Sequence, residues 1–330
     1  MAELSWKDKH RPDKPSLLSS AAHLHTIETC HGSSSSAQWH NRLICGDKNK
    51  VLLALLKEFA QSVNLIYIDP PFMTGRDFTY GTELAYSDRW NNELDGYLQW
   101  LYETLVLLHL LLSEKGSLYI HLDWRTIHYA KVMLDEIFGF SANAEDPGFK
   151  SEIIWHYQSG GRSHKLYARK HDTILLYTKS AEYCFHAERI GERRGSHKRN
   201  HMRKEITADG RVTWTIRSAG RIYTYDEDTL MTPSDVWNDI SHLHQRDPER
   251  NGYATQKPAA LLKRIILASS EENDLVLDCF CGSGVTPVVA EQLHRRWVAC
   301  DQSPLAIQLT QQRLLSCSQL QPMVIQKVAR

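Results

Sequence analysis

The pattern of apolar positions divides the chain into short continuous runs and longer stretches with helical spacing. The runs at 65–68 and 275–277 are apolar throughout, which is typical of strands covered on both faces. We expect further strands at 43–45, 117–123, 152–157, 172–178 and 297–301. Helical spacing predicts helices at 48–60, 94–112, 125–138, 258–268, 286–294 and 304–315. Strands that alternate with helices predict an α/β fold with a mostly parallel sheet.

Composition and charge narrow the possible classes of protein. The 330 residues are 42% apolar, enough for a substantial core, and Lys plus Arg equal Asp plus Glu at 39 each. A formal net charge of zero argues against a histone-like nucleic-acid binder, although local patches can still bind. Without a membrane-length apolar run or a signal peptide, the chain is expected to be soluble and cytosolic. Seven scattered cysteines without a CxxC pair, and histidines without ligand spacing, argue against disulfides and a metal site.

The stretch Asn64 to Phe72 runs from four apolar residues directly into Asp69-Pro70-Pro71-Phe72. Proline cannot continue a strand ladder, so the strand must end there and leave Asp69 at its carboxyl end, where open α/β sheets bind ligands. The turn offers a carboxylate, carbonyl acceptors and an aromatic face, which suit the amine and flat ring of a nucleobase. Asp and Pro are also common turn formers, so an ordinary strand-ending turn remains the alternative for this stretch alone.

A second stretch, beginning at Leu275, combines a strand with a glycine loop and a following helix. Gly282 and Gly284 allow a ligand to approach the backbone closely, and Asp301 at the end of the next strand is placed to bind ribose hydroxyls. The loop is not the G-x-G-x-x-G of dehydrogenases, because Pro287 takes the third position, and it lacks the Lys-Ser/Thr of a P-loop. Asp278 would repel a pyrophosphate but suits an ammonium group. S-adenosylmethionine therefore fits this loop better than NAD or ATP.

Together the two stretches resemble the amino-group DNA methyltransferases, which methylate N6 of adenine or N4 of cytosine. The cofactor motif of that family reads roughly Asp-Pro-Phe-x-Gly-Ser-Gly-Thr-Thr, against Asp-Cys-Phe-Cys-Gly-Ser-Gly-Val-Thr at 278–286 here. Gly46-Asp47 resembles the pair beside the cofactor's adenosine, and 255–258 resembles the segment that closes over its methionine end. The resemblance implies S-adenosyl-L-methionine as cofactor, bound by Asp47, Lys257, Asp278, Phe280, Gly282, Ser283, Gly284, Thr286 and Asp301. It implies catalysis by Asp69, Pro70, Pro71 and Phe72.

The order of the motifs, catalytic before cofactor, resembles the β group of these enzymes, which includes the modification subunits of restriction systems. The resemblance covers residues 41–316. It implies a Rossmann-like class I methyltransferase fold, with a seven-stranded, mostly parallel sheet in the order 3-2-1-4-5-7-6 and strand 7 antiparallel. We expect an irregular N-terminal arm at 1–40, a catalytic half at 41–180, a target-recognition region at 181–245 and a cofactor-binding half at 246–330. Residues 73–91 are expected to form a long functional loop, in which Met73 replaces the family's usual Asn.

Two basic segments are candidates for contact with DNA. The loop at 158–165 combines glycines with cations, and 186–205 holds seven Arg or Lys against three Glu, with Trp and Tyr residues following. The alternative for such a charge run is a solvated surface. The residues that we expect to contact DNA are Arg162, Lys165, Arg193, Arg194, Arg199 and Arg203.

These observations predict a site-specific enzyme that methylates N6 of an adenine flipped out of duplex DNA. Cytosine N4 and an RNA base remain alternative targets, and a DNA-binding protein that has lost catalysis remains a third class. Asp69 favours adenine, because serine is usual at this position in the family's N4-cytosine enzymes. A C5-cytosine enzyme is excluded, because it needs a cysteine after a proline and none of the seven follows one. Expected partners are double-stranded DNA, a second copy of the chain and a cognate restriction endonuclease, in a prokaryotic or phage-encoded, nucleoid-associated setting.

Overall fold

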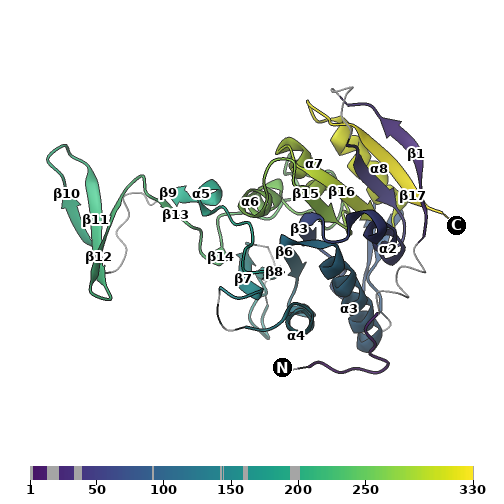
Figure 1. The fold of residues 1–330 in the computed structure, drawn as a ribbon, viewed down its shortest axis with the longest axis horizontal. Coiled ribbons are helices and arrows are strands. Elements are labelled where there is room, and N and C mark those ends of the chain that lie inside the picture. The colour runs from purple at the N-terminus through teal and green to yellow at the C-terminus, as the bar shows by residue number, and fades with distance from the viewer. Residues whose placement is uncertain are drawn as a thin grey trace. The chain divides into compact units, whose positions relative to one another are not determined.

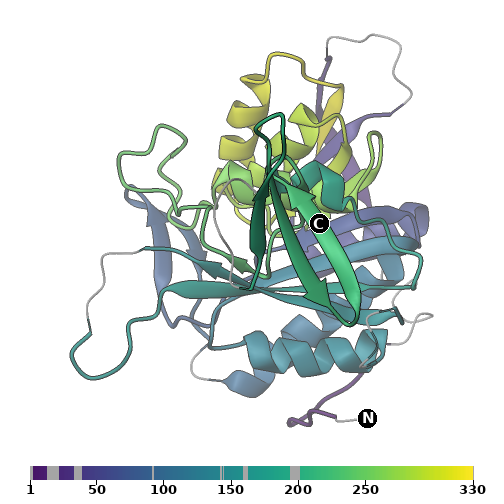
Figure 2. The same cartoon turned by 90° about the vertical axis from the view of Figure 1, so that its left-hand side faces the viewer.

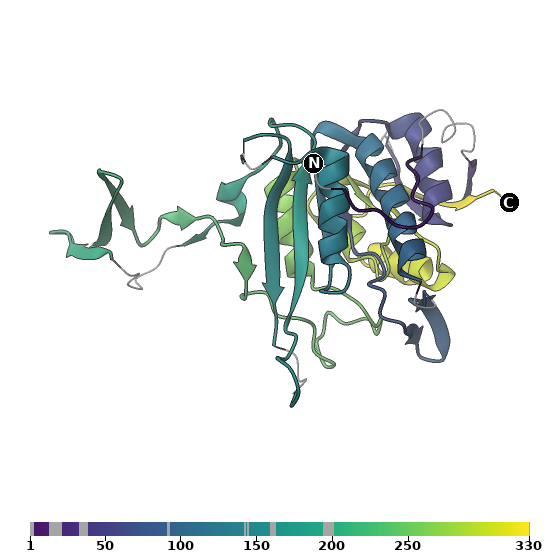
Figure 3. The same ribbon diagram turned by 90° about the horizontal axis from the view of Figure 1, so that it is seen from below.

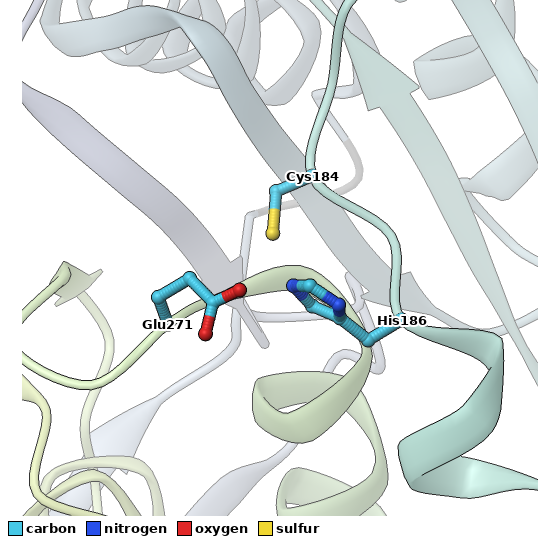
Figure 4. Close-up of side chains that lie close together, drawn as sticks. All are labelled: Cys184, His186 and Glu271. Carbon is cyan, nitrogen blue, oxygen red and sulfur yellow. The ribbon is translucent and has the colours of Figure 1, made fainter.

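The computed structural model describes residues 3–12, 22–32, 39–90, 93–141, 143, 145–158, 163–193 and 201–329. The chain divides into two compact units, one made of 1–184 and 235–330 and the other of 185–234. The first boundary follows Cys184, in the stretch that carries Cys184 and His186 in Figure 4. The predicted target-recognition region, 181–245, contains the second unit and extends beyond it at both ends.

The first unit is built on a ten-stranded sheet (Figure 1). Its strands lie in the order β1 (Leu24–Cys30), β17 (Met323–Val328), β2 (Asn41–Cys45), β16 (Arg296–Asp301), β15 (Leu275–Asp278), β3 (Val63–Ile68), β6 (Leu112–Leu122), β8 (His171–Thr178), β7 (Gly148–His156) and β14 (Val236–Trp237). From β2 to β7 this is the predicted order 3-2-1-4-5-7-6, and within those seven strands β8 alone is antiparallel to its neighbours. The fold prediction is therefore confirmed for the central sheet.

Three further strands extend the sheet beyond the predicted seven. β1 and β17 add to the β2 edge, and β14 pairs in parallel with β7. The prediction of an irregular arm was wrong for 24–30, which form β1. Most residues of β1 are exposed, so the strand has no apolar pattern that a sequence could reveal, and its backbone pairing with β17 decides its conformation.

Helices cover both faces of the sheet (Figure 3). On one face α2 (Lys48–Phe59), α3 (Leu94–Leu111) and α4 (Ile127–Phe138) pack in sequence, and their apolar sides share one buried cluster. On the other face α6 (Ala259–Ser269), α7 (Val285–Gln292) and α8 (Pro304–Leu315) do the same. With both faces covered, the central strands are buried throughout, as their continuous apolar runs predict. Among the described residues, no helix combines the length and apolar character that a membrane crossing requires.

Residues 73–90 contain regular structure, where one long loop was expected. They contain a hairpin of β4 (Asp77–Tyr80) and β5 (Glu83–Ser87), whose Phe78 and Tyr86 rings stack at 4.8 Å. At its base the buried carboxylate of Asp88 accepts hydrogen bonds from the amides of Met73 and Thr74, at 3.0 and 2.7 Å. Asp88 thus fixes the chain that leaves the Asp-Pro-Pro-Phe turn. Because Met73 has a positive φ of 61°, that chain turns sharply here.

The second unit contains a three-stranded antiparallel sheet of β10 (Arg203–Ile206), β11 (Val212–Ser218) and β12 (Arg221–Asp226) (Figure 2). The turn between β11 and β12 is Ala219-Gly220, both with positive φ, as a two-residue hairpin requires. A short helix α5 (Ala187–Ile190) and a pair of β9 (Glu192–Arg193) with β13 (Leu230–Met231) complete it. Trp214 is its buried centre.

Candidate active site

The two motifs of the sequence meet at one edge of the central sheet. β3, β15, β16 and β2 are neighbouring parallel strands, so their carboxyl ends lie side by side. Asp69 follows β3, Asp278 ends β15, Asp301 ends β16 and Asp47 follows β2. More than two hundred residues separate Asp69 from Asp278 in sequence, and the strand order brings them to one site.

A cavity of about 340 Å³ opens at this edge. Its walls include all the predicted catalytic residues and all the predicted cofactor residues except Gly284. Those lining residues are Asp47, Asp69, Pro70, Pro71, Phe72, Lys257, Asp278, Phe280, Gly282, Ser283, Thr286 and Asp301. This volume lies at the lower end of the range of small-molecule sites.

The glycine loop has a conformation that other residues would strain. Gly282 and Gly284 have φ of +47° and +76°, and Gly284 is the left-handed cap of α7. A Cβ on Gly284 would lie 2.5 Å from Oγ1 of Thr310, and one on Gly282 would lie 3.2 Å from the ring of Tyr253. Gly284 therefore allows α8 to pack closely, while Gly282 keeps the backbone open to the cavity.

A buried carboxylate, Asp278, and a half-buried one, Asp301, flank the loop. Asp301 accepts hydrogen bonds from the amides of Gly282, at 3.0 Å, and Ser303, at 2.8 Å. Asp278 accepts from the amide of Phe280 at 2.9 Å. Burial raises the pKa of both carboxyl groups, that of Asp278 to about 7, because a charged carboxylate is costly away from water. An incoming cation or hydroxyl group would compensate that cost.

The catalytic carboxylate predicted from sequence is paired with a lysine. Oδ2 of Asp69 forms an ion pair with Nζ of Lys257, and both side chains are mostly buried. The same Nζ lies 5.3 Å from the centroid of the Phe72 ring. Oδ1 of Asp69 is buried and has no hydrogen-bond partner within the described part of the chain. Lys257 was predicted to bind the cofactor. It lines the cavity, and its contacts in this structure are with Asp69 and Phe72 of the Asp-Pro-Pro-Phe turn.

A buried polar chain supports the Phe72 ring. Phe72 stacks on His121, with ring centroids 6.1 Å apart and planes at 29°. Nδ1 of His121 lies 2.9 Å from the Tyr67 hydroxyl, and Nε2 lies 3.2 Å from Oδ2 of Asp172. The Tyr157 hydroxyl donates to the other oxygen of Asp172 at 2.9 Å. Four adjacent strands or their ends supply these residues, so no local sequence spacing could have revealed the chain.

Further cavity residues escaped the sequence prediction. Lys48 is buried with its Nζ 4.4 Å from the Trp100 ring centroid, and burial lowers its pKa to about 8. Tyr86 of the hairpin and Tyr253 also line the cavity. The sequence offered a signal for two of them: Lys48 directly follows the Gly-Asp pair, and Tyr253 lies two residues before Thr255.

The structure describes three of the six residues that we predicted to contact DNA. Arg162, Arg194 and Arg199 lie outside the described residues. Lys165 is exposed on a loop of the first unit. In the second unit Arg193 and Arg203 are exposed, and they pair with Asp228 at 2.8 Å and with Glu205 at 3.5 Å.

The order of the seven central strands, with a glycine loop after β15, is that of a Rossmann-like class I methyltransferase, and the Asp-Pro-Pro-Phe turn after β3 lines the same cavity as that loop. Residues 63–312 match the family model described as DNA methylase, which groups the N6 and N4 methyltransferases, and the chain belongs to that family. This agrees with the resemblance on which the sequence prediction rested.

Named relatives span most of the chain. The type II methyltransferase M.HpaI of Haemophilus parainfluenzae is 32% identical over 83% of this chain and 74% of its own length. The DNA adenine methyltransferase YhdJ of Escherichia coli K12 is 30% identical over 79% of this chain and 80% of its own. Among solved structures, the cytosine-N4-specific PvuII DNA methyltransferase covers 84% of this chain and 88% of its own, with a TM-score of 0.54 at 20% identity. That likeness confirms the fold.

Proposed function

We propose that the protein is a site-specific DNA methyltransferase that transfers a methyl group from S-adenosyl-L-methionine to N6 of adenine. One observation carries the proposal: the Asp69 carboxylate and the Phe72 ring line the same cavity as the glycine loop and Asp301. An amine acceptor and a nucleoside site thus share one space. The relatives support DNA as substrate, since YhdJ is named a DNA adenine methyltransferase and M.HpaI a type II methyltransferase.

The residues at the cavity fit a sulfonium cofactor better than a nucleotide phosphate. Five aspartates line it against three cations, so the excess of carboxylates disfavours a pyrophosphate and favours positive groups. Asp301 would accept from ribose hydroxyls and Asp278 would face the ammonium group, while Gly282 permits close approach of the backbone. When bound, the cofactor supplies an electrophilic methyl group. A structure of TTHA0409 from Thermus thermophilus, with a TM-score of 0.52 and 19% identity, is of a complex with S-adenosyl-L-methionine.

The Asp-Pro-Pro-Phe turn would prepare the amine for attack. A nucleobase amine is conjugated with its ring and is a poor nucleophile. Asp69 and the Pro70 carbonyl accept its two N–H bonds, which favours lone-pair character on the nitrogen and holds it in line for transfer. The base must leave the duplex at a cost of a few kcal/mol, and stacking on Phe72 offsets about 1–3 kcal/mol of it.

The proposal also names the atom that is methylated, adenine N6 rather than cytosine N4. Asp69 is a stronger acceptor than the serine usual in N4-cytosine enzymes and favours adenine N6, whereas the PvuII enzyme of similar fold is named cytosine-N4-specific. Mass spectrometry of nucleosides from DNA treated with enzyme and cofactor tests this directly. We expect N6-methyladenine from the wild-type enzyme and none from Asp69→Ala. N4-methylcytosine alone would refute the adenine assignment, and absence of any methylated base would refute the function.

Target recognition and partners complete the proposal. Residues 181–245, with the loop that carries Lys165, would contact double-stranded DNA through their exposed cations. The Mod subunit of the type III enzyme StyLTI of Salmonella typhimurium is 24% identical over 75% of this chain, which supports a role in restriction-modification with a cognate endonuclease. Methylation of chromosomal DNA would place the enzyme in the cytoplasm at the nucleoid, and a homodimer would give access to both strands.

A further inference from the structure

One ammonium group occupies two of the three contacts that a target base would use. Nζ of Lys257 pairs with Asp69 and lies 5.3 Å from the Phe72 ring centroid. A base stacked on Phe72 would have its own ring centroid about 4.5–7 Å from that of Phe72, and its amine would lie on Asp69. Oδ1 of Asp69 is buried and has no partner among the described residues, so the lysine and the base compete for Oδ2 and for the space over the Phe72 ring. The base can stack on Phe72 only after the ammonium has moved.

The backbone around Lys257 is anchored, so this movement is confined to the side chain. The amide of Asn251 donates to Oε1 of Gln256 at 2.9 Å, and Nε2 of Gln256 donates to the Glu249 carbonyl at 2.9 Å. On the other side, the amide of Ala259 donates to Oε1 of Glu249 at 2.8 Å. A lysine on a flexible four-carbon stem can swing from such a fixed point without opening the loop.

The carboxylate of a bound cofactor would attract the displaced ammonium of Lys257, because the other cations of the cavity already have partners. Among the described residues, the cations that line the cavity are Lys48, Arg89 and Lys257. The Lys48 ammonium donates to the Asn49 side chain at 2.6 Å and lies over Trp100, and Arg89 pairs with Asp77 at 3.0 Å. Among these three cations, Lys257 is the one whose ion pair within the described part of the chain is to Asp69, the carboxylate that the proposed function assigns to the target amine. The carboxylate of S-adenosylmethionine would offer it a new partner.

We propose that Lys257 is a positioning residue that exchanges from Asp69 to the cofactor carboxylate, so that cofactor binding opens the base site. The inference rests on the proposed function, because it assumes that Asp69 receives the target amine. The ammonium remains protonated and changes only its anionic partner. By thermodynamic reciprocity, a base in the site must raise cofactor affinity by the same factor as the cofactor raises base capture.

Two ligands separate this exchange from ordinary cofactor binding. S-adenosylhomocysteine carries the carboxylate, whereas 5′-methylthioadenosine keeps the adenosine thioether and lacks the amino-acid end. The probe is a duplex containing the methylated site, located by methylation-sensitive sequencing, with 2-aminopurine beside the target base to report its unstacking by fluorescence. For the wild-type enzyme, we expect S-adenosylhomocysteine to increase base capture about five-fold or more, and 5′-methylthioadenosine to leave it unchanged.

Lys257→Met should remove the coupling. We expect base capture without cofactor to rise, S-adenosylhomocysteine affinity measured by calorimetry to fall, and the coupling factor to approach one. Unchanged binding of 5′-methylthioadenosine would show that the variant is folded.

Lys263→Met, which removes an exposed lysine of α6, is the matched control and should keep the wild-type coupling. Coupling retained in Lys257→Met, or an equal effect of both ligands on the wild-type enzyme, would overturn the proposal. Binding is measured without turnover, so a failure of the proposed function would appear separately, as absence of DNA methylation.

Discussion

His121 and Asp172 form a buried pair, with Nε2 of the histidine 3.2 Å from Oδ2 of the aspartate. The pair joins β6 to β8, and the His121 ring stacks on Phe72 of the Asp-Pro-Pro-Phe turn. Burial opposes ionisation of Asp172, but hydrogen bonds from His121 and Tyr157 outweigh it and hold the pKa of Asp172 below its ordinary value. A satisfied buried network of this kind rigidifies its surroundings, so we infer that it fixes the ring on which the target base stacks.

Asp172→Asn should weaken both stability and base capture. We expect a loss of about 1–3 kcal/mol in the free energy of unfolding by urea at pH 7, because a charge-assisted buried hydrogen bond is lost. Since the Asp172 pKa is depressed, this loss should shrink as the pH falls through the folded-state pKa, where the wild-type carboxylate is itself protonated.

The control for that variant is Asp135→Asn. Asp135 also accepts from a tyrosine, Tyr177 at 2.5 Å, and pairs with Lys131 at 2.8 Å, but it lies on α4 and does not line the cavity. It should lose stability while KM for DNA stays unchanged, whereas Asp172→Asn should raise KM for DNA without changing cofactor affinity. If both variants changed KM equally, Asp172 would have no specific role in positioning Phe72.

Asp301→Asn should weaken cofactor binding. The substitution keeps a side-chain oxygen for the Gly282 amide but removes the charge that would accept from ribose hydroxyls. Hydrogen bonds to charged groups contribute about 1.5–3 kcal/mol, so we expect a corresponding loss of S-adenosylhomocysteine affinity in calorimetry. If the affinity for S-adenosylhomocysteine were unchanged, Asp301 would have no role in ribose binding and would only order the glycine loop.

Cofactor affinity should rise with pH near neutrality. The Asp278 pKa of about 7 means that its carboxyl group is largely protonated at pH 6 and ionised at pH 8, and the ionised form attracts the cofactor's ammonium. The same raised pKa makes folding stability fall as the pH rises towards 7, because the folded chain binds this proton more tightly than the unfolded chain. Calorimetric titrations of the cofactor and urea unfolding curves, both from pH 6 to 8, should show both effects reduced in Asp278→Asn. A pH-independent affinity in the wild-type enzyme would contradict the assignment.

The second unit should supply part of the DNA affinity. Neutralising Arg193, Arg194, Arg199 and Arg203 together should weaken DNA binding and reduce the slope of log affinity against log salt, since each phosphate contact releases counterions. Fluorescence anisotropy from low to moderate salt measures the slope. Lys50 and Lys57 are exposed on α2 of the first unit, outside the segments expected to contact DNA. Neutralising these two lysines serves as the charge control. If the wild type and the four-arginine variant had equal slopes, the basic segment at 186–205 would be a solvated surface that does not contact DNA.

The sequence by itself determined the central fold and both motifs. Continuous apolar runs indicated buried parallel strands, and Asp69-Pro70 and Gly282 marked where two of them end, because proline stops a strand and glycine permits a close turn. These signals are local, since each depends on the conformational limits of a few adjacent residues. The membership of the DNA methylase family follows from the same two motifs and agrees with the match over 63–312.

Only the tertiary structure decided which distant side chains meet. Lys257 reaches Asp69 across 188 positions, and the chain from Tyr67 through His121 to Asp172 crosses three strands that are adjacent in space but not in sequence. The strand β1 likewise carries no apolar pattern and exists because β17 offers a backbone edge. Such contacts depend on strand order and on the free energy of burying polar groups with the right partners, and no periodicity along a single chain encodes either of them.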